Sequence, residues 1–132
     1  EPFLVSSTIV GVLAQRLVRR ICPDCRKSYQ PHPEQLRELG IKEENFRKIK
    51  RSFYRGEGCD KCRQTGYRGR IGIHELLEIT EGLKNTILES SDSTTIKKQG
   101  LKEKMITLRR DGVNKILNGL TTVEEILSIT SE

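Results

Sequence analysis

Aromatic side chains are scarce in this chain. Only 5% of its 132 residues are aromatic, Trp is absent, and 34% of the residues are hydrophobic. Large apolar side chains supply most of the surface that a core removes from water, so the core must be modest. The length allows one domain or two small ones.

Long apolar runs are also missing. The longest, from Ile9 to Leu13, is broken by Gly11 and lies just before Gln15 and Arg16. A membrane-spanning helix needs about 20 apolar residues, so we expect a soluble protein. Because the sequence opens on Glu1 rather than on Met, we also expect it to be part of a longer protein.

Patterns that indicate catalysis are absent. The sequence has no glycine-rich phosphate loop followed by Lys and Ser or Thr, and no supported Ser/His/Asp arrangement. His32 lies between two prolines and is expected to be solvated, while His74 is expected to be structural. Glu75 and Glu78 are expected to be exposed carboxylates. Taken alone, the chain is predicted to be an interaction module without enzymatic activity.

Four cysteines form two identical pairs, Cys22 with Cys25 and Cys59 with Cys62. Each Cys-x-x-Cys turn can place two thiolates on one side of a tight loop, and two such loops supply four sulfurs in a tetrahedron. This spacing predicts a structural zinc site. Such a site is coordinatively closed, which favours a stabilising role over a catalytic one.

Two other cysteine chemistries stay open: a pair of disulfides and a redox-active Cys-x-x-Cys. Neither a secretory signal nor a βαβ pattern accompanies the pairs, so both are less favoured. Basic residues flank each pair and would offset the negative charge of a zinc tetrathiolate; they are Arg20, Arg26, Lys27, Lys61 and Arg63.

The net charge of +6 is concentrated in residues 42–70, whereas residues 71–132 are net acidic. A basic zinc module can indicate nucleic-acid binding. Aromatic residues are too few, and finger-type Cys/His spacing is absent, so the sequence disfavours nucleic acid as a partner. An acidic protein or anionic lipid headgroups would explain the charge as well as nucleic acid does, and a solvated surface explains it best.

The apolar spacing in residues 3–20 predicts one amphipathic helix whose polar face includes Arg16 and Arg19. Short helices are expected at residues 34–40 and 42–50, the second anchored by Phe46 and Ile49. A short strand is expected at residues 52–55. Residues 71–79 are predicted to form a strand whose sheet lies outside the chain.

The remainder of the chain has a helical pattern. Thr80 is expected to cap a helix over residues 81–89, and Asp92 or Ser93 the next helix. A third helix is expected between Leu108 and Leu117. Thr122 and Glu125 predict a reciprocal capping box at the start of the last helix. We expect these helices to form one small bundle.

Longer stretches resemble a known family. These stretches are residues 1–5 (EPFLV), 14–25 (AQRLVRRICPDC), 58–75 (GCDKCRQTGYRGRIGIHE) and the tail around residues 121–125 (TTVEE). They resemble the C-terminal part of the bacterial ATPases that drive type II secretion and type IV pilus assembly. The match covers nearly the whole chain. The RICPDC and GIHE segments favour type II secretion over pilus assembly.

The resemblance implies a cytoplasmic homo-hexamer with a RecA-like α/β motor domain at the inner face of the bacterial inner membrane. The parent would bind ATP and Mg²⁺, and would contact an inner-membrane platform protein and other components of the machinery. Cys22, Cys25, Cys59 and Cys62 match the family's zinc ligands. Arg16 and Arg19 match a basic helix that approaches nucleotide or a neighbouring subunit.

Under this resemblance the chain itself is mainly α and divides into four parts. Residues 1–21 would be a late helix of the motor domain and 22–63 the tetracysteine zinc module. Residues 64–79 would return as a turn and strand to the motor domain, and 80–132 would form a helical subdomain. The family's phosphate loop, acidic metal-binding motif and histidine motif are missing, so ATP hydrolysis would belong to the parent. The alternative is a freestanding zinc-stapled module that binds protein or nucleic acid.

Overall fold

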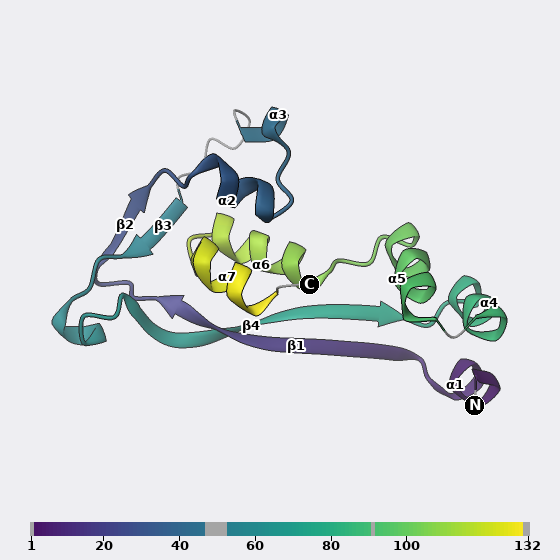
Figure 1. Cartoon of the computed structure of the whole chain (residues 1–132). Helices are drawn as coiled ribbons and strands as arrows, with labels where there is room; N and C mark the ends of the chain where they lie inside the picture. The colour runs from purple at the N-terminus through teal and green to yellow at the C-terminus, as the bar shows by residue number, and fades with distance from the viewer. Residues whose placement is uncertain (1, 47–52, 91, 131–132) are drawn as a thin grey trace. The chain divides into compact units, whose positions relative to one another are not determined.

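The computed structural model describes residues 2–46, 53–90 and 92–130, and shows a small mixed α/β structure (Figure 1). The chain divides into two compact units. One is formed by residues 1–15 and 74–107, and the other by residues 16–73 and 108–132. In the described ranges no helix is long and apolar enough to cross a membrane.

The helix expected over residues 3–20 is wrong for most of its length. A helix α1 covers Pro2–Thr8, and the chain then continues as strand β1 (Gly11–Ile21). Apolar residues lie on both faces of this strand, so their spacing also fits a helix. Long-range pairing decides between the two structures, as it often does for a segment with mixed local preference.

The partner of β1 is strand β4 (Tyr67–Glu78), which contains most of the strand expected at residues 71–79. The two strands run in opposite directions: the Ile79 N–H donates to the Val10 carbonyl at 3.0 Å, and the Cys22 N–H donates to the Gly66 carbonyl at 2.9 Å. The strand expected at residues 71–79 therefore finds a partner within the chain, and that partner is β1, which was expected to be helical. In the described residues this sheet has two strands.

The unit that contains the cysteines has its own apolar core. Helices α2 (Pro33–Glu38), α6 (Leu108–Leu117) and α7 (Val123–Ile129) contribute to it. Its buried residues are Val18, Leu36, Leu39, Phe53, Ile73, Val113, Ile116, Val123 and Ile126. The core therefore combines Leu36, Leu39 and Phe53, which lie between the cysteine pairs, with residues from before and after them.

A second ladder lies in the same unit. Strands β2 (Arg26–Tyr29) and β3 (Phe53–Gly56) pair in antiparallel fashion, with Arg26 opposite Gly56 and Tyr29 opposite Phe53. The strand expected at residues 52–55 is thus confirmed from Phe53 onward. Helix α3 (Glu43–Phe46) begins the helix expected at 42–50, whose remainder, including Ile49, lies outside the described residues, as does the Phe46 side chain.

The start of α7 differs from the predicted capping box in one bond. The Thr122 hydroxyl accepts a hydrogen bond from the Glu125 N–H at 3.1 Å, as expected. The Glu125 carboxylate does not return to Thr122. It accepts instead from the backbone N–H of Arg19 at 2.7 Å and from the Arg19 Nε at 2.8 Å. A buried carboxylate gains more from a charged donor than from a neutral amide.

The other unit contains α1, α4 (Glu81–Glu89) and α5 (Ser93–Lys102), with α4 packed against both of the others. Thr80 and Asp92 cap α4 and α5, which confirms both expected caps. The helices expected to form one bundle over residues 80–132 are divided between the two units. Helices α4 and α5 belong to one unit, whereas α6 and α7 pack together in the other.

Replacing Gly112 by Ala is predicted to destabilise the core. A Cβ at this position would lie 2.8 Å from Cδ1 and Cγ2 of Ile126, which is fully buried and cannot move aside. Overpacking of this kind costs about 1–3 kcal/mol, which exceeds the roughly 1 kcal/mol that alanine gains over glycine in a helix. Urea unfolding should show a lower midpoint.

The matched control is Gly82→Ala in α4. There a Cβ would meet the ends of the long Glu103 and Gln99 side chains, at 2.9 and 3.1 Å, and these can move. We expect its stability to change by less than about 1 kcal/mol. Equal losses in the two variants would contradict the packing assigned to Gly112.

Candidate metal centre

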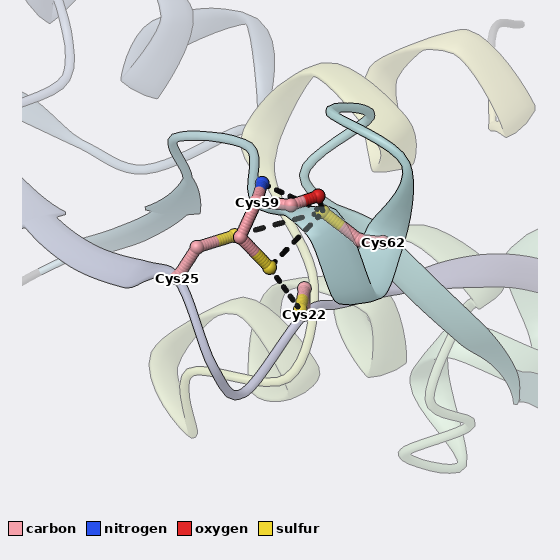
Figure 2. Close-up of side chains that lie close together, drawn as sticks. All are labelled: Cys22, Cys25, Cys59 and Cys62. Carbon is pink, nitrogen blue, oxygen red and sulfur yellow. Dashed lines mark hydrogen bonds between the residues drawn. The ribbon is translucent and has the colours of Figure 1, made fainter.

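The four cysteine side chains converge on one point (Figure 2). Cys22 follows the end of β1, and Cys25 immediately precedes β2. Cys59 is the N-cap of a 3₁₀ turn, η1 (Asp60–Cys62), and Cys62 is its last residue. All four sulfur atoms lie within 4.8 Å of one another, so the two loops that the sequence pairs by motif are also paired in space.

The sulfur separations match those of a tetrahedral metal site. Cys22 and Cys59 Sγ are 3.8 Å apart, as are Cys25 and Cys62 Sγ, and Cys59 and Cys62 Sγ are 3.7 Å apart. A zinc ion bound at about 2.3 Å from each sulfur requires edges of about 3.8 Å. The four cysteines can therefore hold a metal ion such as zinc. They carry no disulfide, which disfavours the disulfide alternative.

Backbone amides point at two of the sulfurs. Cys62 Sγ accepts from the N–H groups of Cys59 and Gly66, both at 3.3 Å, and Cys25 Sγ accepts from the Gly58 N–H at 3.3 Å. Burial raises the pKa of the Cys25 thiol to about 12. Burial acts in the same direction on Cys62, but hydrogen bonds from the Gly66 and Cys59 N–H groups and from the Cys59 and Cys25 thiols together lower the pKa of that thiol to about 6. The site thus favours at least one thiolate, the form that binds a metal.

The surroundings of the cluster exclude most of the solvent. Cys22 is fully buried, Cys25 and Cys62 are buried, and Cys59 is half-buried. Four thiolates would complete a tetrahedron and leave no position for substrate or an activated water. The donor set therefore suits a structural metal.

Asp24 bridges the two cysteine loops outside the cluster. Its carboxylate contacts Lys61 Nζ at 3.4 Å and Arg68 Nη1 at 3.2 Å. From the sequence, the basic residues near the cysteines were expected to offset the negative charge of the thiolates. The ion pairs that Asp24 makes with Lys61 and Arg68 were not predicted. The position of Asp24 inside the first Cys-x-x-Cys was the available signal. Exposed ion pairs contribute little individually, so we assign Asp24 an orienting role.

Two glycines let the loops approach. The Gly56 and Gly66 backbones touch so closely that a Cβ on Gly66 would lie 2.5 Å from the Gly56 carbonyl oxygen. Gly66 also has a positive φ of 81° and donates its N–H to Cys62. The sequence predicted a turn and a strand over residues 64–79, but not this contact.

The two arginines singled out from the sequence lie on β1, not on a helix. Arg19 is held by Glu125 and stacks over the Tyr67 ring at 4.0 Å from its centroid. Arg16 is exposed on the same strand. Neither belongs to the cysteine cluster, and a role for either at nucleotide or at a subunit boundary stays a prediction.

The histidines and the strand carboxylates also lie outside the cluster. His32 is the N-cap of α2, where its Nδ1 accepts from the Glu34 N–H at 3.2 Å. It is exposed but not merely solvated, because it caps this helix. His74 is exposed on β4, where Glu75 is half-buried and Glu78 exposed.

Comparison with known proteins places the chain in a family. The family model described as type II/IV secretion system protein matches residues 1–128. The chain belongs to this family. It is 44% identical to the type IV pilus assembly ATPase PilB of Thermus thermophilus, 43% to the type II secretion system protein E of Dickeya dadantii, and 41% to the type II secretion system ATPase E of Vibrio cholerae.

Each of these alignments covers the whole chain over 132 residues. The chain spans 15% of the length of the pilus ATPase and 25% of the length of the two secretion proteins. The resemblance inferred from the motifs is therefore confirmed. In this family member the cysteine loops are part of a unit that also contains α6 and α7.

Gly66→Ala is predicted to disturb the metal centre, with Gly69→Ala as its control. Both glycines have φ near +80°, so either substitution incurs about 1–2 kcal/mol of backbone strain. A Cβ on Gly69 meets nothing within 4 Å, whereas one on Gly66 must push the Gly56 backbone away. We expect the Gly66 variant to be the less stable in thermal unfolding and to bind Co²⁺, a spectroscopic probe, more weakly. Identical Co²⁺ titrations for the two variants would be evidence against the close approach.

Proposed function

We propose that the chain is the C-terminal, metal-stapled region of an ATPase that powers type II secretion or type IV pilus assembly. The observation that carries this proposal is alignment of the whole chain, at 41–44% identity, with proteins named as such ATPases or secretion proteins. Both classes occur among these relatives at nearly equal identity. The residues of the RICPDC and GIHE segments favour type II secretion over pilus assembly.

Under this proposal ATP and Mg²⁺ bind elsewhere in the longer protein. The sequence has no phosphate-binding loop, and its four-sulfur cluster would be saturated by the metal. The parent would be a cytoplasmic hexamer with a RecA-like motor domain, acting at the inner face of the inner membrane with a platform protein. Hydrolysis would belong to that assembly and not to this chain alone.

Exposed apolar side chains support the proposal that this chain packs against another part of a longer protein. In the unit formed by α1, α4 and α5, Val10 is 89% exposed, Phe3 67% and Leu13 61%. Several large apolar side chains left this exposed on one small unit are expected where another part of the protein covers them. The two-stranded β1–β4 sheet points the same way, since two strands alone are marginally stable. Residues 1–21 and 64–79 would then belong to the motor domain, with β1 and β4 as strands of its sheet.

The metal, which we propose to be Zn²⁺ held by Cys22, Cys25, Cys59 and Cys62, acts as a staple. The four ligands come from the ends of β1 and β2 and from the loop after β3. One ion would thus hold three segments that the small apolar core secures only in part. Binding to a site that exists only in the folded chain contributes directly to folding free energy.

A freestanding binding module is the second candidate. It is favoured by one observation: the unit with the cysteines has its own buried core, including Val18, Phe53 and Ile126. It is disfavoured by the exposed apolar residues of the other unit. The alignment over the whole chain leads us to prefer the ATPase region.

The purified chain is predicted to contain one zinc per molecule. Its thiols should react with a thiol reagent only after a strong chelator has removed the metal. Cys59→Ser should lose most of the zinc and several kcal/mol of stability. Lys61→Ser, which removes a neighbouring exposed side chain and one surface ion pair, should keep both. Metal analysis and denaturant unfolding provide the measurements, and four reactive thiols in the untreated chain would refute the zinc site.

The proposed ATPase role is tested by a segment exchange. The 132 residues replace the aligned segment of the Vibrio cholerae type II secretion ATPase E, and ATP hydrolysis is measured. We expect activity within about tenfold of the natural enzyme, because the exchanged segment would supply the same sheet strands and staple. The enzyme without the segment is the negative control. A soluble, folded chimera no more active than that control would overturn the proposal.

A further inference from the structure

Each cysteine sulfur lies close to a sulfur of the other loop. Cys22 and Cys59 Sγ are 3.8 Å apart, and so are Cys25 and Cys62 Sγ (Figure 2). These two pairs use every cysteine once, and each joins residues 37 positions apart in the chain. A disulfide holds its sulfurs at about 2.05 Å, so each pair must approach by about 1.8 Å. The cluster is therefore arranged so that two bonds between the loops can form without separating them.

Backbone hydrogen bonds hold the two loops together without a metal ion. The Glu57 N–H donates to the Cys25 carbonyl at 3.1 Å, next to the β2–β3 ladder. The Cys22 N–H donates to the Gly66 carbonyl at 2.9 Å. These bonds lie before and after the second cysteine pair, so they fix it against the first. If the metal were lost, sulfurs of opposite loops would stay near each other.

Bonding within each loop is the competing outcome, because Cys59 and Cys62 Sγ are 3.7 Å apart. A disulfide within a Cys-x-x-Cys closes a very short loop, whereas one between the loops spans 37 positions. The longer span removes more conformational freedom from the unfolded chain, so a bond between the loops stabilises the fold more. Because this coupling is reciprocal, the folded chain favours the bonds between the loops.

Cys59 is the residue that an oxidant in solution reaches first. Cys22, Cys25 and Cys62 are buried, whereas Cys59 is half-buried. The susceptibility of a thiolate to oxidation follows its exposure. Hydrogen peroxide is much smaller than the aromatic reagents used to count thiols, so it reaches a half-buried sulfur that they do not. We therefore expect Cys59 to be oxidised first and Cys22, across the loops, to complete the disulfide.

We propose that the cluster is a peroxide-responsive site, oxidised to one disulfide between Cys22 and Cys59 and another between Cys25 and Cys62. The Cys59 thiolate attacks a peroxide oxygen, the O–O bond breaks, and a sulfenic acid and hydroxide result. The Cys22 thiolate then attacks the sulfenic sulfur, forms the S–S bond and displaces a second hydroxide. One peroxide thus takes two electrons from two sulfurs, and a second peroxide oxidises the other pair.

Oxidation would exchange one staple for another. The thiolate is the form of cysteine that binds a metal, so the metal is released when the sulfurs become disulfides. The two loops stay joined, now by covalent bonds. This inference rests on the metal site proposed above.

The test treats the purified, zinc-loaded chain with hydrogen peroxide and follows zinc release with a coloured chelator. Complete release should consume about two peroxides per zinc, one for each disulfide. Dithiothreitol with added zinc should restore the bound metal, because disulfides are reducible. The peroxide-treated chain should also unfold at a higher temperature than the reduced chain stripped of zinc, since the disulfides constrain its unfolded state.

Peptide mapping identifies the pairs once free thiols have been alkylated. Asp24 lies between Cys22 and Cys25, and Asp60 between Cys59 and Cys62. Cleavage at aspartate combined with trypsin therefore places each cysteine in its own peptide. With less than one peroxide per zinc, the Cys22 peptide should be joined to the Cys59 peptide. With excess peroxide, the Cys25 and Cys62 peptides should be joined as well.

Two matched variants separate bonds between the loops from bonds within them. Cys22→Ser should leave Cys59 unpaired after oxidation, with Cys25 bonded to Cys62. Cys25→Ser should leave Cys62 unpaired, with Cys22 bonded to Cys59. Bonding within the loops would instead join Cys59 to Cys62 in both variants. If either variant fails to fold, the mapping of the natural chain decides.

The outcomes distinguish this inference from the metal site on which it rests. A purified chain without zinc would overturn the metal site itself. If the chain holds zinc, three results would overturn the peroxide response alone: zinc retained in excess peroxide, disulfides within the loops, or an oxidised chain no more stable than the stripped one.

Discussion

The convergence of four thiols is the constraint on which the cysteine-containing unit depends. Cys22 and Cys25 bound the passage from β1 to β2, and Cys59 and Cys62 occupy the loop between β3 and β4. Bringing their sulfurs to 3.7–3.8 Å sets where all four strands can begin or end. The Gly56–Gly66 contact and the Asp24 bridge follow from that approach, because the loops must touch for the sulfurs to meet.

A second, non-metal link ties the same unit to the end of the chain. Glu125 at the start of α7 accepts both the backbone N–H and the side chain of Arg19 on β1, and the Thr121 hydroxyl donates to the Arg19 carbonyl at 2.8 Å. The Glu125 side chain is 8% exposed. A carboxylate so buried needs a charged, hydrogen-bonded partner, and this one joins residues over 100 positions apart in sequence. Arg19 therefore has a structural role in this unit.

Features that depend on a few neighbouring residues were predicted correctly from the sequence. The caps at Thr80, Asp92 and Thr122 depend on a side chain and an amide three residues later, so sequence was sufficient. The pairing of the cysteine loops was predictable because a metal site needs four ligands and the chain has four cysteines. By contrast, residues 11–20 have apolar side chains at spacings that fit both a helix and a strand, and their hydrogen bonds to β4 decide between them.

By itself, the sequence determined the cysteine cluster, the family and the positions of most helices, since each rests on residue type and short spacing. Tertiary structure alone decided that β1 is a strand and that the four C-terminal helices divide between two units. It also decided that the Glu125 carboxylate binds Arg19 rather than the N–H of its own helix cap. Each of these depends on contacts between residues far apart in the chain. A short sequence pattern does not show which distant strand or charged group a residue will pair with, because several partners are possible and the folded structure selects one.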